Sequence, residues 1–155
     1  MFKFKKYGQK GSTIIELLIA LMVVGLVVTA VAAAGTYSIK NTGEARFRQV
    51  ATTLGQEVIE KSKNEKSRLG FINFINVVGD NTYCFDTVPA DFETSLPASG
   101  TCASDDVVSL AGSDFIREVV FTTSVTEVNV EVNISWDDSG SPRTVQLVQT
   151  LANTQ

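Results

Sequence analysis

Hydrophobic and polar positions divide the chain into three regions with different periods. The first region is an apolar run, Leu17–Ile39, which holds 23 residues and no charged side chain. As a helix this run would be about 35 Å long, which is enough to cross a hydrocarbon core of roughly 30 Å. The run therefore predicts a transmembrane or signal helix near the amino terminus.

The second region has the period of an amphipathic helix, predicted over residues 40–68. Its apolar positions recur at helical spacing, namely Phe47, Val50, Ala51, Leu54 and Val58. The residues between them are polar: Glu44, Arg46, Arg48, Gln49, Gln56 and Glu57. A basic-rich stretch, 61–68, suits a helix carboxyl end, and Gly70 is a suitable stop. Joined to the apolar run, the helix would start at Ser12 and be about 85 Å long; the alternative is a break at 41–43.

The carboxyl-terminal third changes to the two-residue period of a β-strand. Alternate residues are apolar without a slip at Val128, Val130, Val132, Ile134 and Trp136. A strand is also predicted over Phe115–Ser124, with Val119 and Phe121 facing inward. A turn at Asp137–Pro142 leads to a third strand, Thr144–Leu151. Such an antiparallel meander needs a cover for its apolar face, and the amphipathic helix supplies one.

The stretch between helix and sheet, 70–112, is the least regular part of the sequence. The segment "FINFINVV" predicts one short helix, and a long loop follows between Cys84 and Cys102. In an exported protein such a pair most simply forms a disulfide, which would stabilise the fold by roughly 3 kcal/mol. Two free thiols in a reducing compartment are the alternative. Neither a CxxC spacing nor a histidine partner favours a metal or redox site.

Charge is unevenly distributed between the amino terminus and the rest of the chain. No acid precedes Gly11, but four lysines do: Lys3, Lys5, Lys6 and Lys10. Over residues 12–155 the remaining 9 basic residues face 17 acidic ones, which leaves a net charge of about −8. The lysines predict that residues 1–11 face the cytoplasm and that the rest is delivered outward. The acidic body lacks the basic patch that phosphate binding needs, so no nucleic-acid partner is expected.

Residues able to carry out catalysis are sparse. The chain has no histidine, which removes the commonest general base and a frequent metal ligand. We find no nucleophile–base pair, phosphate-binding loop or metal-ligand cluster in the sequence, and we expect neither an enzyme nor a cofactor. The paired acids Asp105-Asp106 and Asp137-Asp138 are predicted to be solvated surface. A calcium site at residues 137–138 is the alternative.

Glu16 is an acid at the start of an otherwise apolar helix. Thr13-Ile14-Ile15-Glu16 has the T-x-x-E pattern of a capping box, in which the carboxylate accepts a hydrogen bond from a free amide at the helix start. This accounts for the charge but for no other feature of the segment. A secretory signal cut before Gly35, after Ala32-Ala33-Ala34, is a further alternative. The apolar stretch before that cut is longer than in a usual signal.

The order of features around Glu16 resembles the prepilin signature of type IV pilins and type II secretion pseudopilins. A basic leader ends in Gly11, and a small residue, two β-branched apolar residues, Glu16 and a long apolar helix follow. The resemblance implies that a prepilin peptidase removes residues 1–11 by cutting between Gly11 and Ser12, and that the new amino group of Ser12 is N-methylated. It also implies that Glu16 neutralises the amino terminus of a neighbouring subunit. The family's most frequent first mature residue is Phe, and Ser12 departs from it.

A long helix, a variable loop and an antiparallel sheet together resemble the type IV pilin fold. The predicted class is therefore α+β, with the amino-terminal helix packed on three or four strands within residues 114–152. The ending "VNISWDDSGSPRTVQLVQTL" looks like that of minor pilins and pseudopilins of the PilV and GspI kind, through its W-turn-V-x-L spacing. The cysteines depart from the commonest pilin pattern, in which the disulfide staples the carboxyl-terminal segment, because here they precede the predicted sheet.

These resemblances imply a structural subunit of a type IV pilus or a type II secretion pseudopilus, with a minor subunit slightly favoured. The expected layout is a leader (1–11), a hydrophobic transmembrane and assembly helix (12–39) and a globular pilin domain (40–155). The chain would wait in the inner membrane as a single-pass protein, in contact with lipid, before it joins a cell-surface or periplasmic filament. Expected partners are other pilin or pseudopilin subunits, the prepilin peptidase and the inner-membrane assembly platform. The alternative is a membrane-anchored or secreted extracytoplasmic binding module with no filament role.

Overall fold

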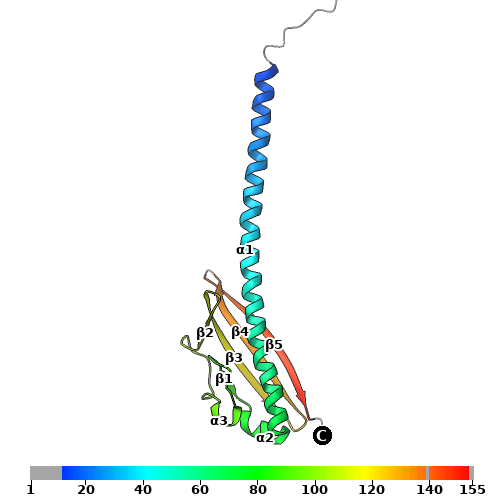
Figure 1. Ribbon diagram of the computed structural model, residues 1–155, viewed down its shortest axis with the longest axis vertical. Helices are drawn as coiled ribbons and strands as arrows, with labels where there is room; N and C mark the ends of the chain where they lie inside the picture. Colours follow the sequence, from blue (N-terminus) through cyan, green and yellow to red (C-terminus); the bar gives the residue numbers. More distant parts are fainter. Residues whose placement is uncertain (1–11, 139, 154–155) are drawn as a thin grey trace, which may run out of the picture. The chain divides into compact units, whose positions relative to one another are not determined.

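The computed structural model describes residues 12–138 and 140–153 (Figure 1). The predicted leader and Gly11 lie outside the described residues. The chain forms two compact units, which divide between Gly43 and Glu44.

Helix α1, Ser12–Leu69, begins in the first unit and ends in the second. Its helical conformation includes residues 41–43, so the predicted alternative of a break at this point is wrong. Gly70 follows with φ of 77°, a left-handed conformation that glycine adopts without the steric cost of a Cβ. The predicted stop at Gly70 is confirmed.

In the first unit, the side chains of residues 13–38 are all exposed. Two threonine hydroxyls of this stretch donate to the backbone of the helix itself. Thr29 Oγ1 donates to the carbonyl oxygen of Gly25 at 3.0 Å, and Thr36 Oγ1 donates to that of Ala32 at 3.1 Å. Such internal bonds satisfy polar groups in an apolar medium, where no water is present to do so.

In the second unit, the remaining part of α1 covers one face of an antiparallel sheet (Figure 1). The predicted apolar stripe is confirmed, because Ala51, Leu54 and Val58 are buried and Phe47 and Val50 pack against the same core. Gly55 allows a close approach to the sheet, since a Cβ at this position would lie 2.7 Å from Cδ1 of Leu147.

The sheet has five strands, and its neighbours follow the order β1-β3-β4-β5, with β2 also paired to β3. Their bounds are β1 Thr82–Cys84, β2 Val107–Leu110, β3 Ser113–Thr123, β4 Glu127–Asp138 and β5 Ser141–Ala152. The predicted meander corresponds to β3, β4 and β5, and all five apolar positions of its middle strand are buried.

Two details of the sheet differ from the prediction. The first is the number of strands, because β1 and β2 lie inside the stretch expected to be irregular. Both are only 3 or 4 residues long, too short for a two-residue period to emerge from the sequence. The second is the turn at Asp137–Pro142, where pairing continues through Asp137↔Pro142 and Asp138↔Ser141. The strands therefore extend further, and the turn is tighter than the polar residues suggest.

Aromatic rings fill the core between α1, the sheet and the connecting segments. Helix α2, Phe71–Val78, confirms the predicted short helix and buries Phe71, Phe74 and Val78. The ring of Phe74 lies 6.3 Å from that of Phe92 and 6.2 Å from that of Phe121, between ring centroids. Phe92 opens the short helix α3, Phe92–Ser95. The connecting loop is therefore anchored in the core through an aromatic side chain.

Cys84 and Cys102 form a disulfide, as predicted. The expectation that this bridge precedes the sheet is only partly right, because Cys84 belongs to β1 and is paired with Glu118 of β3. The bridge thus ties the loop that carries α3 to an edge of the sheet.

Candidate functional site

The exposed apolar surface of α1 is the most prominent candidate site in the first unit. Its large aliphatic side chains are 53–70 % exposed from Ile14 to Val31. Among the described residues, one helix is long and apolar enough to cross a membrane, by length and composition alone, and that helix is α1. Contiguous apolar surface of this extent marks contact with lipid or with another protein.

Glu16 lies at the amino-terminal end of this surface, among exposed apolar neighbours such as Ile15 and Leu17. Helix α1 already includes Ser12 and Thr13, and no acidic residue lies in its first turn. In a capping box the threonine is the residue that flanks the helix and the acid lies in the first turn. The capping-box interpretation of Thr13 and Glu16 is therefore wrong.

The other predicted site residues are divided among α1, the globular unit and the residues outside the described range. Ser12 is the first residue of α1, four positions before Glu16 and therefore about one helical turn away from it. Gly11, on the other side of the predicted cleavage site, lies outside the described residues. Cys84 and Cys102 belong to the second unit.

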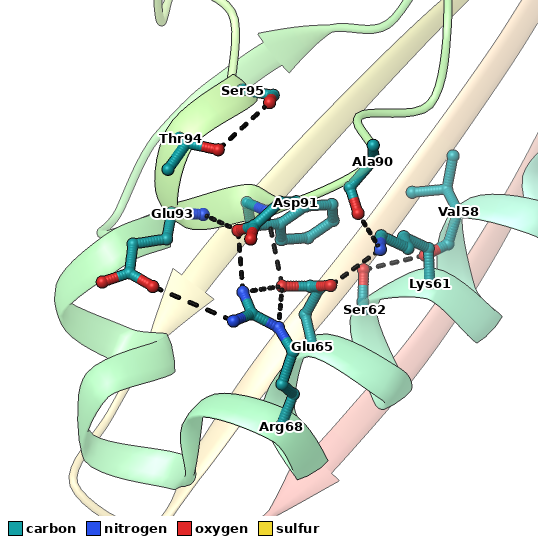
Figure 2. A network of polar contacts seen from close by, with 11 residues as sticks. Val58, Lys61, Ser62, Glu65, Arg68, Ala90, Asp91, Glu93, Thr94 and Ser95 are labelled. Atoms are coloured by element: carbon teal, nitrogen blue, oxygen red, sulfur yellow. Dashed lines mark hydrogen bonds and ion pairs between the residues drawn. The ribbon is translucent and has the colours of Figure 1, made fainter.

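A polar cluster that the sequence did not predict holds α3 against the end of α1 (Figure 2). At its centre is Glu65, whose side chain is only 3 % exposed. Its carboxylate accepts from Lys61 Nζ at 2.7 Å and from Arg68 Nη2 at 2.8 Å. Arg68 Nη2 also donates to Asp91 Oδ1 at 2.7 Å. Asp91 in turn caps α3 by accepting from the amide of Glu93 at 2.8 Å.

The charge state of Glu65 follows from these contacts. Burial by itself would raise the pKa of Glu65, but the hydrogen bonds from Arg68 and Lys61 outweigh it and lower the pKa to about 2. The carboxylate is therefore ionised at neutral pH. A sequence signal existed, because Ser62 and Glu65 continue the buried stripe after Val58 at spacings of four and three residues, and both are buried. The basic residues around Ser62 and Glu65 made this part of the stripe hard to recognise in the sequence.

Arg117 is a second buried ion that the sequence analysis missed. Its side chain is 2 % exposed, between the inward-facing residues Phe115 and Val119 of β3. The guanidinium donates to the carbonyl oxygen of Phe85 at 2.9 Å and to Glu57 Oε2 at 3.1 Å. Burial lowers the pKa of Arg117, and the charge of Glu57 opposes that effect. Arg117 thus links β3 to α1 and to the segment after β1.

Asp137, one of the two acids proposed as a calcium alternative, forms a hydrogen bond within the β4–β5 turn. Asp137 Oδ1 accepts from the amide of Gly140 at 2.6 Å. Among the described residues, no group of three or more His, Cys, Asp or Glu side chains is placed to hold a metal ion. The two buried ionic clusters described above join α1 to the start of α3 and to β3, and the exposed apolar surface of α1 is the candidate functional site.

Comparison with known families identifies the amino-terminal segment. Residues 6–32 match the prokaryotic N-terminal methylation motif, which is typical of type IV pilins and pseudopilins. Comparison with curated proteins and with solved structures gave no significant match. The matched segment includes Gly11, Ser12 and Glu16 and most of the apolar run.

The motif and the fold together define a class of protein. The chain carries a methylation motif of the kind found in prepilins, and its long amino-terminal helix with an apolar start and its antiparallel sheet form a pilin-like α+β fold. The motif implies processing by a prepilin peptidase and assembly into a filament. Pilins are generally structural proteins without enzymatic activity. The apolar helix and the disulfide-bonded globular unit are consistent with a membrane-anchored extracytoplasmic pilin.

Proposed function

We propose that this chain is a subunit of a helical filament, a type IV pilus or a type II secretion pseudopilus, and that it assembles through its amino-terminal helix. One observation carries the proposal. A methylation motif coincides with an apolar helix surface that no described part of the chain covers. A helix that packs only against membrane lipid would not need an acid at its start, whereas a helix that packs against other copies has a use for one.

Processing comes first in the proposed sequence of events. The prepilin peptidase removes residues 1–11 by cutting between Gly11 and Ser12, and Ser12 becomes the N-methylated first residue. Until then the chain is held in the inner membrane as a single-pass protein, with the apolar part of α1 in lipid. The four lysines before Gly11 stay in the cytoplasm, and the globular unit from Glu44 onward lies outside.

Glu16 sets the register during assembly. The cut leaves a positive charge on the amino group of Ser12, and this charge enters an apolar bundle. A single buried charge is costly, whereas two opposite charges that are desolvated together attract strongly. The carboxylate of Glu16 in one subunit therefore neutralises the amino group of a neighbour, and only one axial offset brings the two groups together. The failure of the capping-box interpretation leaves Glu16 available for this role.

A finer assignment rests on the carboxyl-terminal segment. The Trp136-turn-Val145-x-Leu147 spacing of β4 and β5 supports a minor subunit of the PilV or GspI kind. The partners of the assembled chain are further copies of itself and other pilin or pseudopilin subunits, with the assembly platform of the inner membrane acting before them.

The test is the intact mass and the amino-terminal sequence of the protein purified from its native host. A chain that starts at Ser12, with or without one added methyl group, is the expected result. A chain that starts at Gly35 would contradict the proposal and show a secreted soluble domain. An uncut Met1 would also contradict it and leave a membrane-anchored binding module.

A further inference from the structure

The two ends of strand β3 carry two exposed apolar features, one beside a basic residue and the other beside an acidic residue. Leu110, the last residue of β2, is paired with Ser113 at the start of β3. The turn that begins at Ser124 follows the other end, Thr123. An 11-residue strand separates the two surfaces by roughly 33 Å. Both belong to the globular unit.

At the start of β3 there is a shallow groove between α1 and β2. Its volume is about 310 Å³, and it is lined by Arg46, Gln49, Val50, Thr53, Leu54 and Leu110. Leu110 is 47 % exposed, so the groove is apolar where it meets solvent. Arg46 lies at its edge and forms no ion pair within the described residues, in contrast to Arg48, which binds Glu44 at 2.9 Å.

At the other end of β3, the turn 124–127 projects an apolar side chain. Val125 is 85 % exposed, the most exposed large hydrophobic residue described. Hydrogen bonds hold the turn in place, because the amide of Ser124 donates to the carbonyl oxygen of Glu127 at 2.8 Å and the amide of Glu127 donates to Ser124 Oγ at 3.0 Å. The carboxylate of Glu127 has no ion pair in the described part of the chain. The turn thus presents a fixed apolar knob beside an unpaired acid.

We propose that the Val125 knob of one copy of this chain inserts into the Arg46–Leu110 groove of a second copy, where Glu127 pairs with Arg46. The proposal rests on the proposed function, because it names a contact between subunits of the same filament. An acidic knob meets a basic groove, so the charges select this pairing over groove against groove or knob against knob. A knob and a groove at opposite ends of the subunit cannot satisfy each other within one copy. The contact is heterologous and leaves one knob and one groove free at the ends of any chain of copies, which is the geometry of an open filament.

The first test reverses the charges. Arg46→Glu and Glu127→Arg are each expected to reduce the fraction of the protein recovered in sheared filaments roughly tenfold, because like charges then face each other. The double variant is expected to restore that fraction, since the pair is re-formed with its signs exchanged. Restoration also excludes misfolding as the cause of either single loss. Two impaired single variants without restoration would overturn the pairing.

The second test examines the apolar part of the contact by changing Val125. Val125→Asp is expected to impair assembly to a similar degree, whereas Ile72→Asp, a matched change at a 59 % exposed apolar residue of α2, is expected to leave it intact. Equal effects of the two changes would overturn a specific role of the knob.

The third test is a cross-link between copies. Cells that co-express one copy carrying Leu110→Cys and another carrying Val125→Cys are expected to yield a disulfide-linked dimer in filaments, whereas either variant alone is not. Because roughly 33 Å separates the two positions in one copy, far beyond the 7 Å Cα separation that a disulfide tolerates, the bond reports a contact between copies. Filaments that contain both variants without the cross-link would overturn the knob-and-groove contact and leave the proposed filament role standing. Absence of the wild-type chain from filaments would overturn the proposed function with it.

Discussion

The two units of this chain differ in the burial of their apolar side chains. In the globular unit the large apolar residues of α1, such as Leu54 and Val58, are covered by the sheet. In the first unit, residues of the same type on the same helix, such as Leu21 and Val24, are more than half exposed. Burying such side chains is favourable in either case. The difference shows that the sheet covers the apolar side chains in one part of α1, whereas those in the other part stay exposed.

Two acidic residues of α1, Glu65 and Glu16, show the same contrast. Glu65 has two cationic partners within its own chain, so it contributes to folding. Glu16 lies on an exposed apolar surface, and its proposed partner is the amino group of another subunit. Under the proposed function, the same type of side chain serves stability in one unit and association in the other, according to where its counter-charge lies.

The largest expected effect comes from Glu16→Ala, which should prevent assembly without affecting folding. Loss of one partner from a buried ion pair costs roughly 3–5 kcal/mol, which corresponds to about a hundredfold or more in subunit affinity. The measurement is the fraction of protein in sheared filaments against the fraction in the membrane. Thermal unfolding of the detergent-solubilised chain should be unchanged. Normal assembly of the Glu16→Ala chain would show that the acid does not set the register.

A core truncation should produce the reverse result. Phe74→Ala is expected to lower the free energy of unfolding by about 3–5 kcal/mol, because the side chain is fully buried and packs against Phe92 and Phe121. Val24→Ala, in the exposed stretch, should change it by less than about 0.5 kcal/mol. Urea unfolding of the solubilised chain measures both. A comparable loss in the two variants would mean that the apolar run also supports the globular core.

Removal of the disulfide should give a smaller loss confined to the globular unit. Cys84→Ser combined with Cys102→Ser is expected to cost about 3 kcal/mol, because the bridge closes a loop with a sequence separation of 18. Unfolding of the untreated chain after reduction by dithiothreitol should show the same loss. A reduced chain as stable as the oxidised one would indicate that the Glu65 cluster and Phe92 suffice to hold this loop.

The smallest effect should appear on acidification. Because the pKa of Glu65 is lowered from 4.5 to about 2 in the folded chain, its stabilisation is fully present above about pH 4.5 and is lost as the pH falls towards 2. The loss should be about 1–2 kcal/mol, less than the full shift implies because Lys61 and Arg68 are partly solvated. Thermal unfolding from pH 6 to 2 measures it. The Glu65→Gln chain should lack this part of the pH dependence, and an unchanged profile would contradict the role of the ion pairs.

Long periodic segments were predictable, and short or exceptional ones were not. The twelve-residue strand β4 was recognisable because its alternation extends over many residues. Strands β1 and β2 were missed because 3 or 4 residues carry too little periodicity, and they exist because β3 offers them its free edge. Arg117 and Glu65 were missed because charged residues are expected at the surface. Their partners come from positions such as Phe85 and Asp91 that no local pattern relates to them.

The sequence by itself determined the elements that depend on local order: the methylation motif, the apolar run, the amphipathic stripe of α1 and the three long strands. It also determined that two cysteines were available in a chain with an apolar amino-terminal run. Only the tertiary structure decided which ions are buried with partners, that Cys84 joins the sheet, and that Thr13 lies inside the helix rather than capping it. It also placed Arg46 and Val125 at opposite ends of the globular unit. The physical reason is that periodicity and motifs are properties of neighbouring residues, whereas burial and ion pairing depend on segments that meet only when the chain folds.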